Sequence, residues 1–162
     1  MSKAAALLAV VLALGGTLRS QRPDAGPDPE SPRRPAPVRF SAVDVFIDAG
    51  DAPLAAYQFE LKVTAGDVTL VGVEGGEHPA FASPPYYDPR ALAQRRIVIA
   101  AFDAGDDLPR GRTRVARVMV RVTGGRTPAY EATLVVAASG DARSIPANIS
   151  VSDTSGPEGA ER

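Results

Sequence analysis

The stretch "AAYQFELKVT", residues 55–64, decides the fold because the character of its side chains alternates with a period of two. A β-strand places successive side chains on opposite faces, so this pattern predicts a strand with one face in a core and the other in water. The apolar set and the polar set are Ala55, Tyr57, Phe59, Leu61 and Val63 against Ala56, Gln58, Glu60, Lys62 and Thr64.

Six further stretches, at 38–47, 67–73, 96–102, 114–123, 130–138 and 148–152, also favour strands. In 114–123 one face is predicted to hold Ala116, Val118, Val120 and Val122, and in 130–138 the apolar face is predicted to hold Tyr130, Ala132, Leu134, Val136 and Ala138. "RIVIAAF" (96–102) is apolar throughout, which predicts a strand buried on both faces. In the first stretch the apolar parity slips between Ala42 and Val43, which indicates a bulge. The one helical candidate is 88–96, with Pro89 at the first helical position. Seven short strands separated by Gly, Pro and Asp predict an all-β fold, an antiparallel β-sandwich.

The N-terminal part of the chain differs in composition from the rest. Residues Ala4–Leu18 are uncharged and almost wholly apolar, yet the run is shorter than the roughly 20 residues that cross a bilayer. We therefore expect a signal peptide or a signal-anchor at 1–18, and an exported protein that is periplasmic, extracellular or anchored facing outward. A Pro-rich disordered linker is expected at 19–37, the sandwich at 38–151 and a disordered tail at 152–162. Membrane contact is expected through the N-terminal segment alone, if it is uncleaved.

The composition excludes several kinds of chemistry. The chain has 162 residues, a net charge of −1, no Cys and a single His. Thiolate chemistry is therefore excluded, and the balanced charge favours no nucleic-acid partner. The motifs of nucleophilic hydrolases, zinc proteases and nucleotide-binding enzymes are missing from the sequence, so we expect no catalysis and no organic cofactor. Arginines at 110, 112, 114, 117, 121 and 126 predict a solvated outer face that discourages edge aggregation.

The tetrapeptide DAGD occurs twice, at Asp48–Asp51 and at Asp103–Asp106. We expect two turns in which Asp caps through its side chain, Gly supplies a positive φ and a following Pro stiffens the next segment. The alternative is calcium, which needs hard oxygen ligands. The second copy suits it better, because three carboxylates crowd one loop there: Asp103, Asp106 and Asp107.

The long loop Glu74–Arg90 holds His78 and three aromatic residues, Phe81, Tyr86 and Tyr87. Long loops are often functional, and a Tyr on a Pro-stiffened loop contributes a large contact area with little entropy to lose. The alternative is a flap whose aromatic rings close one end of the sandwich. His78 has no neighbouring catalytic residues in the sequence, so we assign it no role.

The order of the strands resembles that of cohesin domains and their relatives in the carbohydrate-binding-like sandwich superfamily, over roughly Ala42 to Val151. Three groups of positions carry the resemblance: Ala56, Gln58, Phe59, Leu61 and Val63; Val73, Glu74 and Gly75; and Ile97, Ile99, Ala100, Gly111, Val115, Ala116, Val118, Val120 and Val122. The stretch "SGDARSIPANISVS" resembles the final turn and strand of the family. The resemblance implies a jelly-roll sandwich of nine strands or a similar number, which in cohesins binds dockerin modules through one sheet face.

These observations lead to an expected function, an exported non-catalytic module that recognises a protein partner, dockerin-like or another envelope protein. The residues expected to contact the partner are Tyr57, Phe81, Tyr86, Tyr87 and Arg117. Two alternatives stay open: a carbohydrate-binding module whose ligand is a polysaccharide, and a structural envelope domain that acts as a spacer.

Overall fold

The computed structural model describes residues 35–154, so the expected leader, most of the linker and most of the tail lie outside it. The described residues form eight strands and two short 3-10 helices. In chain order they are β1 (Val38–Asp48), β2 (Ala56–Ala65), β3 (Asp67–Gly75), η1 (Pro79–Phe81), β4 (Tyr86–Tyr87), η2 (Pro89–Ala93), β5 (Arg96–Phe102), β6 (Arg112–Thr123), β7 (Ala129–Ala138) and β8 (Asn148–Asp153).

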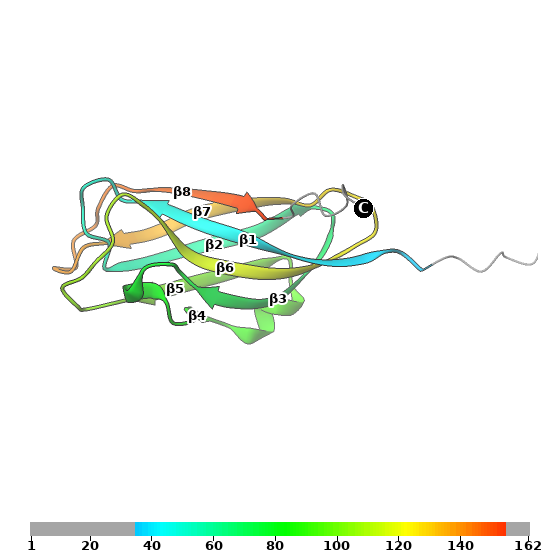
Figure 1. The fold of residues 1–162 in the computed structure, drawn as a ribbon, viewed down its shortest axis with the longest axis horizontal. Coiled ribbons are helices and arrows are strands. Elements are labelled where there is room, and N and C mark those ends of the chain that lie inside the picture. Colours follow the sequence, from blue (N-terminus) through cyan, green and yellow to red (C-terminus); the bar gives the residue numbers. More distant parts are fainter. Residues whose placement is uncertain (1–34, 155–162) are drawn as a thin grey trace, which may run out of the picture. The chain divides into compact units, whose positions relative to one another are not determined.

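The strands form two four-stranded sheets. Sheet A has the order β3-β6-β1-β8 and sheet B the order β4-β5-β2-β7, with every pair antiparallel. Figure 1 shows the two layers, with β1, β6 and β8 of sheet A nearer the viewer than β2 and β7 of sheet B. The predicted β-sandwich is confirmed. All seven expected strands are present, and the two-residue β4 is additional.

The core lies between the sheets and follows the period-two pattern. In β2 the apolar set points inward, and Phe59 and Leu61 are almost completely buried. The inner face of β6 is likewise the predicted set Ala116, Val118, Val120 and Val122. Burying such side chains contributes about 1.5–3 kcal/mol each, so the inner faces supply most of the stability of the sandwich.

At two places a β-bulge interrupts the predicted alternation of inward and outward side chains. The register of β1 and β6 shifts between Val45 and Phe46, where Val115 is the extra residue, and not between Ala42 and Val43 as predicted. A second shift between Gln58 and Phe59 leaves Val135 of β7 without an opposite residue. Each bulge reverses the inward and outward sides of the residues beyond it.

The prediction that 96–102 is buried on both faces is wrong. Ile97 and Ile99 of β5 point into the core, whereas Val98 and Phe102 point to the outside of sheet B.

The helical segment predicted at 88–96 is observed as the shorter 3-10 helix η2. Asp88 caps η2 by accepting from the Arg90 backbone N–H at 2.9 Å, with Pro89 at its first position as expected. Within residues 35–154 no helix is both long and apolar enough to span a bilayer.

Candidate functional site

The loop between β3 and β4 closes one end of the core. His78 caps η1 by accepting the Ala80 backbone N–H on Nδ1 at 3.3 Å, and Pro79 begins the turn. This turn directs Phe81 inward, where it meets the Tyr57 ring edge-on with 5.1 Å between ring centroids. Phe81 is buried, so its predicted role as a direct contact is wrong, because η1 turns its ring into the core. The alternative interpretation as a flap describes this residue.

Tyr57 is also a core residue and not a surface residue. It lies on the inner face of sheet B, is 2% exposed and donates a hydrogen bond from its hydroxyl to the Val115 carbonyl oxygen of sheet A at 2.8 Å. Burial raises the pKa of Tyr57 well above its usual range. The prediction that Tyr57 contacts a partner is therefore wrong, because the period-two pattern places it on the inner face.

Arg117 lies on the outer face of sheet A and is engaged by an acid. Its Nε and Nη2 donate to the two carboxylate oxygens of Asp44 at 2.7 and 2.8 Å, and Arg114 Nε lies 3.9 Å from Asp44 Oδ1. The Arg117 hydrogen bond lowers the pKa of Asp44; burial opposes this, and the charges of Arg117 and Arg114 lower it further. Because two nitrogens of the Arg117 guanidinium are bound to Asp44, this side chain supports the sheet. A partner could bind Arg117 only by breaking this ion pair.

Other arginines of the expected stripe also have partners within the sandwich. Arg110 donates to the Asp51 backbone oxygen, and Arg112 lies over the Phe46 ring with 3.6 Å from its central carbon to the ring centroid. Arg121 donates to the Thr69 hydroxyl at 3.3 Å. These three arginines are therefore held by contacts with the loops and strands around them.

Both DAGD copies contain the expected side-chain cap. Asp48 Oδ1 accepts the Gly50 backbone N–H at 3.0 Å, and Asp103 Oδ1 accepts the Gly105 backbone N–H at 2.7 Å. Gly50 has a φ of 56°, as predicted, but the prediction of a positive φ is wrong for Gly105. The same four letters thus form two related turns with different backbones at glycine.

The three aspartates of the second copy do not converge. The Asp103 carboxylate caps its own turn, and Asp107 Oδ1 lies 3.8 Å from Nε2 of His78. In the described part of the chain, no three His, Asp or Glu side chains are grouped to hold a metal ion. Calcium binding stays a prediction, which thermal unfolding with excess calcium and with a chelator tests. A bound ion would raise Tm in calcium alone, and an Asp103→Asn variant would not respond.

Tyr86 is the predicted contact residue that the structure places in water. It is 70% exposed on β4, and its ring stacks against Phe102 of β5 with 6.3 Å between centroids and 10° between planes. Phe102 is itself 69% exposed. Tyr87, by contrast, lies opposite Ile99 and packs against the core, so it is half-buried. Both rings of the stacked pair therefore lie on the outer face of sheet B, on the neighbouring strands β4 and β5.

The two rings belong to a wider outward surface. The strand register aligns Tyr86, Ala100, Gln58 and Val136 in one row across sheet B from β4 to β7. Val136 is 42% exposed because the β7 bulge turns it outward, and Tyr86, Val98, Ala100 and η2 surround a shallow hollow. We call this surface the sheet B platform: Gln58, Tyr86, Val98, Ala100, Phe102 and Val136.

Sequence reasoning found Tyr86 but missed Phe102, Val98 and Val136. The uniform run "RIVIAAF" hides the fact that one of its faces is open, because apolar residues on both faces give no alternation to interpret. The β7 alternation placed Val136 inside, and the bulge that reverses it depends on pairing with β2.

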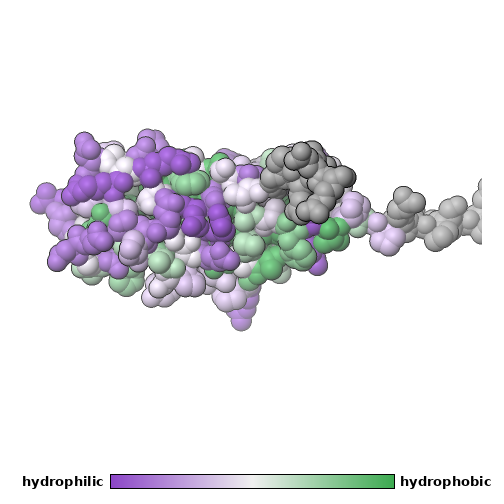
Figure 2. Space-filling view, viewed as in Figure 1, coloured by the Kyte–Doolittle hydropathy of each residue, from purple (hydrophilic) through white to green (hydrophobic). Residues whose placement is uncertain are grey.

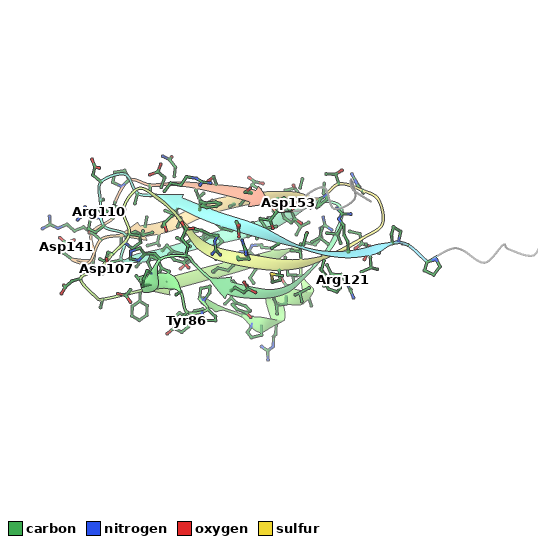
Figure 3. The ribbon with its side chains drawn as sticks, viewed as in Figure 1. Tyr86, Asp107, Arg110, Arg121, Asp141 and Asp153 are labelled. Carbon is green, nitrogen blue, oxygen red and sulfur yellow. The ribbon has the colours of Figure 1, made fainter. Side chains whose placement is uncertain are left out.

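Figure 3 shows Tyr86 on the β4 side of the sandwich and Asp107, Arg110 and Asp141 at one end.

Comparisons with known proteins do not extend this description. No family model matches the chain, and no curated protein or solved structure is similar enough to count as a match.

Proposed function

We propose that this protein is an exported, non-catalytic binding module that recognises a protein partner at the cell envelope through the sheet B platform. The observation that supports this most is the stacked pair Tyr86 and Phe102, two large aromatic side chains that are 70% and 69% exposed. Leaving such rings in water is unfavourable unless another surface covers them, and contiguous exposed apolar surface is typical of interaction sites.

The chemistry of the platform suits a protein surface. Around the two rings lie the aliphatic Val98 and Val136, with the amide of Gln58 in the same row. An apolar centre with a few polar groups is the usual composition of a protein interface. Tyr86 adds a hydroxyl at the edge of an apolar ring, which favours contact with a partly polar partner.

We further infer that the sandwich is of the cohesin-like jelly-roll type. The resemblance implies partner binding through one sheet face, and the platform is a sheet face. The expected set of contact residues is revised: Tyr86 remains at the centre, Phe102 joins it, and Tyr57, Phe81 and Arg117 are left out. A dockerin-like module or another envelope protein is the partner class that we propose.

Capture experiments test this proposal. The full chain, carrying an affinity tag, is exposed to an envelope extract, and captured proteins are identified and then purified for direct binding measurements. We expect Tyr86→Ser with Phe102→Ser to weaken binding by at least about tenfold, as hot-spot aromatic residues do. Phe40→Ser is the matched control, because Phe40 is also 69% exposed but lies on sheet A. Binding that both variants lower equally, or that neither lowers, would contradict the proposal.

A polysaccharide is the second candidate ligand, favoured by one observation. The rings of Tyr86 and Phe102 are within 10° of parallel, and the apolar faces of sugar rings stack on such aromatic surfaces. A glycan array probed with the wild-type chain and with Phe102→Ser separates the candidates. Glycan binding that disappears in Phe102→Ser would replace the protein partner by a polysaccharide, and silence on the array together with no captured protein would leave a structural spacer.

A further inference from the structure

The outer face of sheet A is divided into two halves of opposite character. Toward one end, Phe46 of β1 is half-buried beneath the guanidinium of Arg112, and the Asp44–Arg117 pair lies beside it. Toward the end where β1 begins, Val38, Phe40 and Val71 are 56%, 69% and 49% exposed. Figure 2 shows hydrophilic residues gathered over the first half and hydrophobic residues over the second.

The exposed half contains a groove, which we call the sheet A groove. Its lining is Phe40, Thr69, Leu70, Val71, Leu92, Ala93 and Arg121, from β1, β3, β6 and η2. Arg121 lies directly opposite Phe40 in the strand register, yet its guanidinium donates to the Thr69 hydroxyl. Phe46 is therefore covered by a cation, whereas the cation opposite Phe40 is directed to Thr69. The groove presents apolar surface with a positive charge at its rim.

The start of strand β1 lies beside this groove. Strand β1 begins at Val38, two residues before Phe40. The apolar run Ala4–Leu18 is connected to it through the 19 residues from 19 to 37. Such a segment reaches at most about 60 Å when fully extended, at about 3.3 Å per residue. A bilayer that holds the apolar run is therefore within reach of the groove.

We propose that the sheet A groove rests on the surface of a bilayer that contains anionic phospholipid, with Ala4–Leu18 held in the same bilayer. Phe40, Val71 and Leu92 would enter the boundary between headgroups and acyl chains, and Arg121 would meet the phosphates. The inference rests on the expected export segment, not on the sheet B platform. It adds an orientation to the proposed function: the platform, on the other outer face of the sandwich, is directed away from the lipid.

The test uses the lack of tryptophan in the chain, which makes an introduced indole the sole tryptophan emitter. Phe40→Trp and Phe102→Trp are matched reporters, since both phenylalanines are 69% exposed but on different sheets. Each full-length variant is made by cell-free synthesis with vesicles of phosphatidylcholine and phosphatidylglycerol, with and without brominated acyl chains. We expect the Phe40→Trp variant to emit at shorter wavelength and lose most of its intensity to bromine, and the Phe102→Trp variant to change in neither respect.

Several outcomes would overturn the inference. Bromine could quench both variants equally or neither of them, or the chain could fail to sediment with the vesicles. The emission of Phe40→Trp could also move to shorter wavelength at high protein concentration without vesicles, which would indicate that a second copy of the chain covers the groove. Val71→Trp is a second reporter in the groove and should repeat the Phe40→Trp result. Omitting phosphatidylglycerol, or adding Arg121→Gln, should lower the quenching. Because no partner protein is present, this test can fail while the capture experiment succeeds, and the reverse.

Discussion

Phe40 and Phe102 are equally exposed, at 69%, but lie on the two opposite outer faces of the sandwich. Phe102 stacks on a second exposed ring, Tyr86, and shares sheet B with outward-facing valines. Phe40 lines a groove on a sheet whose other half is polar, where Phe46 lies beneath Arg112. The same side chain with the same exposure thus belongs to two different surfaces, which are distinguished by its neighbours and not by its exposure.

The two faces also differ in how charge is used. Sheet A holds a nearly buried carboxylate, Asp44, in the fork of Arg117. The corresponding ion pair on sheet B, Arg96 with Glu60 at 2.6 Å, is exposed on the Arg96 side. Removing charge should therefore destabilise the fold on sheet A and have little effect on sheet B.

The largest expected effect comes from Asp44→Ala. This change leaves Arg117 and Arg114 without their shared acceptor, and we expect it to lower the free energy of unfolding by about 2–3 kcal/mol, less than for a fully buried pair because Arg117 is part-exposed. Glu60→Ala is the matched change on sheet B and should cost less than about 1 kcal/mol. Urea denaturation of both variants measures the difference, and equal decreases in stability would remove the distinction between the faces.

The pH dependence of stability sharpens the same distinction. The pKa of Asp44 is lowered in the folded protein, so the unfolded chain binds this proton more readily. Its contribution is present above the unfolded value of about 3.9 and disappears as pH falls through the lower folded value. We expect the stability of the wild type to fall more steeply than that of Asp44→Asn in acid, measured by urea midpoints at successive pH values. Parallel curves would show that Asp44 is not the group responsible.

The hydroxyls of Tyr57 and Tyr130 test whether a hydrogen bond between the two sheets contributes to stability. Tyr57→Phe removes the hydrogen bond from sheet B to the Val115 oxygen of sheet A, and we expect stability to fall by about 1–2 kcal/mol. The Tyr130 hydroxyl, whose pKa burial and then the Asp153 charge raise to about 12, makes no hydrogen bond with the described residues. Tyr130→Phe should therefore leave stability unchanged or raise it slightly. Chemical denaturation compares them, and a larger decrease in Tyr130→Phe would refute this assignment.

The smallest effects on stability are expected at the two exposed phenylalanines. Phe40→Ser and Phe102→Ser should each change the free energy of unfolding by less than about 0.5 kcal/mol, as surface substitutions do. Their consequences for binding should nevertheless differ, because Phe102→Ser should weaken partner capture and Phe40→Ser should weaken binding to vesicles. Thermal unfolding of both proteins checks the first part. A large decrease in the stability of either would mean that its ring supports the fold.

The two DAGD turns show how far local sequence reaches. An Asp two residues before a Gly predicts a side-chain cap, and both caps form. Whether the glycine takes a positive φ depends on distant residues. Gly50 is held by its carbonyl oxygen, which accepts from the Gly111 backbone N–H at 2.6 Å, next to a bond from Ala49 N–H to the Gly111 oxygen at 3.1 Å. Within residues 35–154 no such backbone bond from a distant strand holds Gly105, and its φ is not positive.

What the sequence by itself determined is the set of strands and the inner faces of β2 and β6, because a period of two separates core from solvent within each strand. It also determined the caps of the Asp turns, which involve residues two positions apart, and the position of Pro89 at the start of η2. Only the tertiary structure decided the bulge positions, the open outer face of β5 and the distribution of Tyr86, Phe102, Phe40 and Arg117 over two faces. Those features depend on which strands pair and in which register, and a single strand does not contain that information.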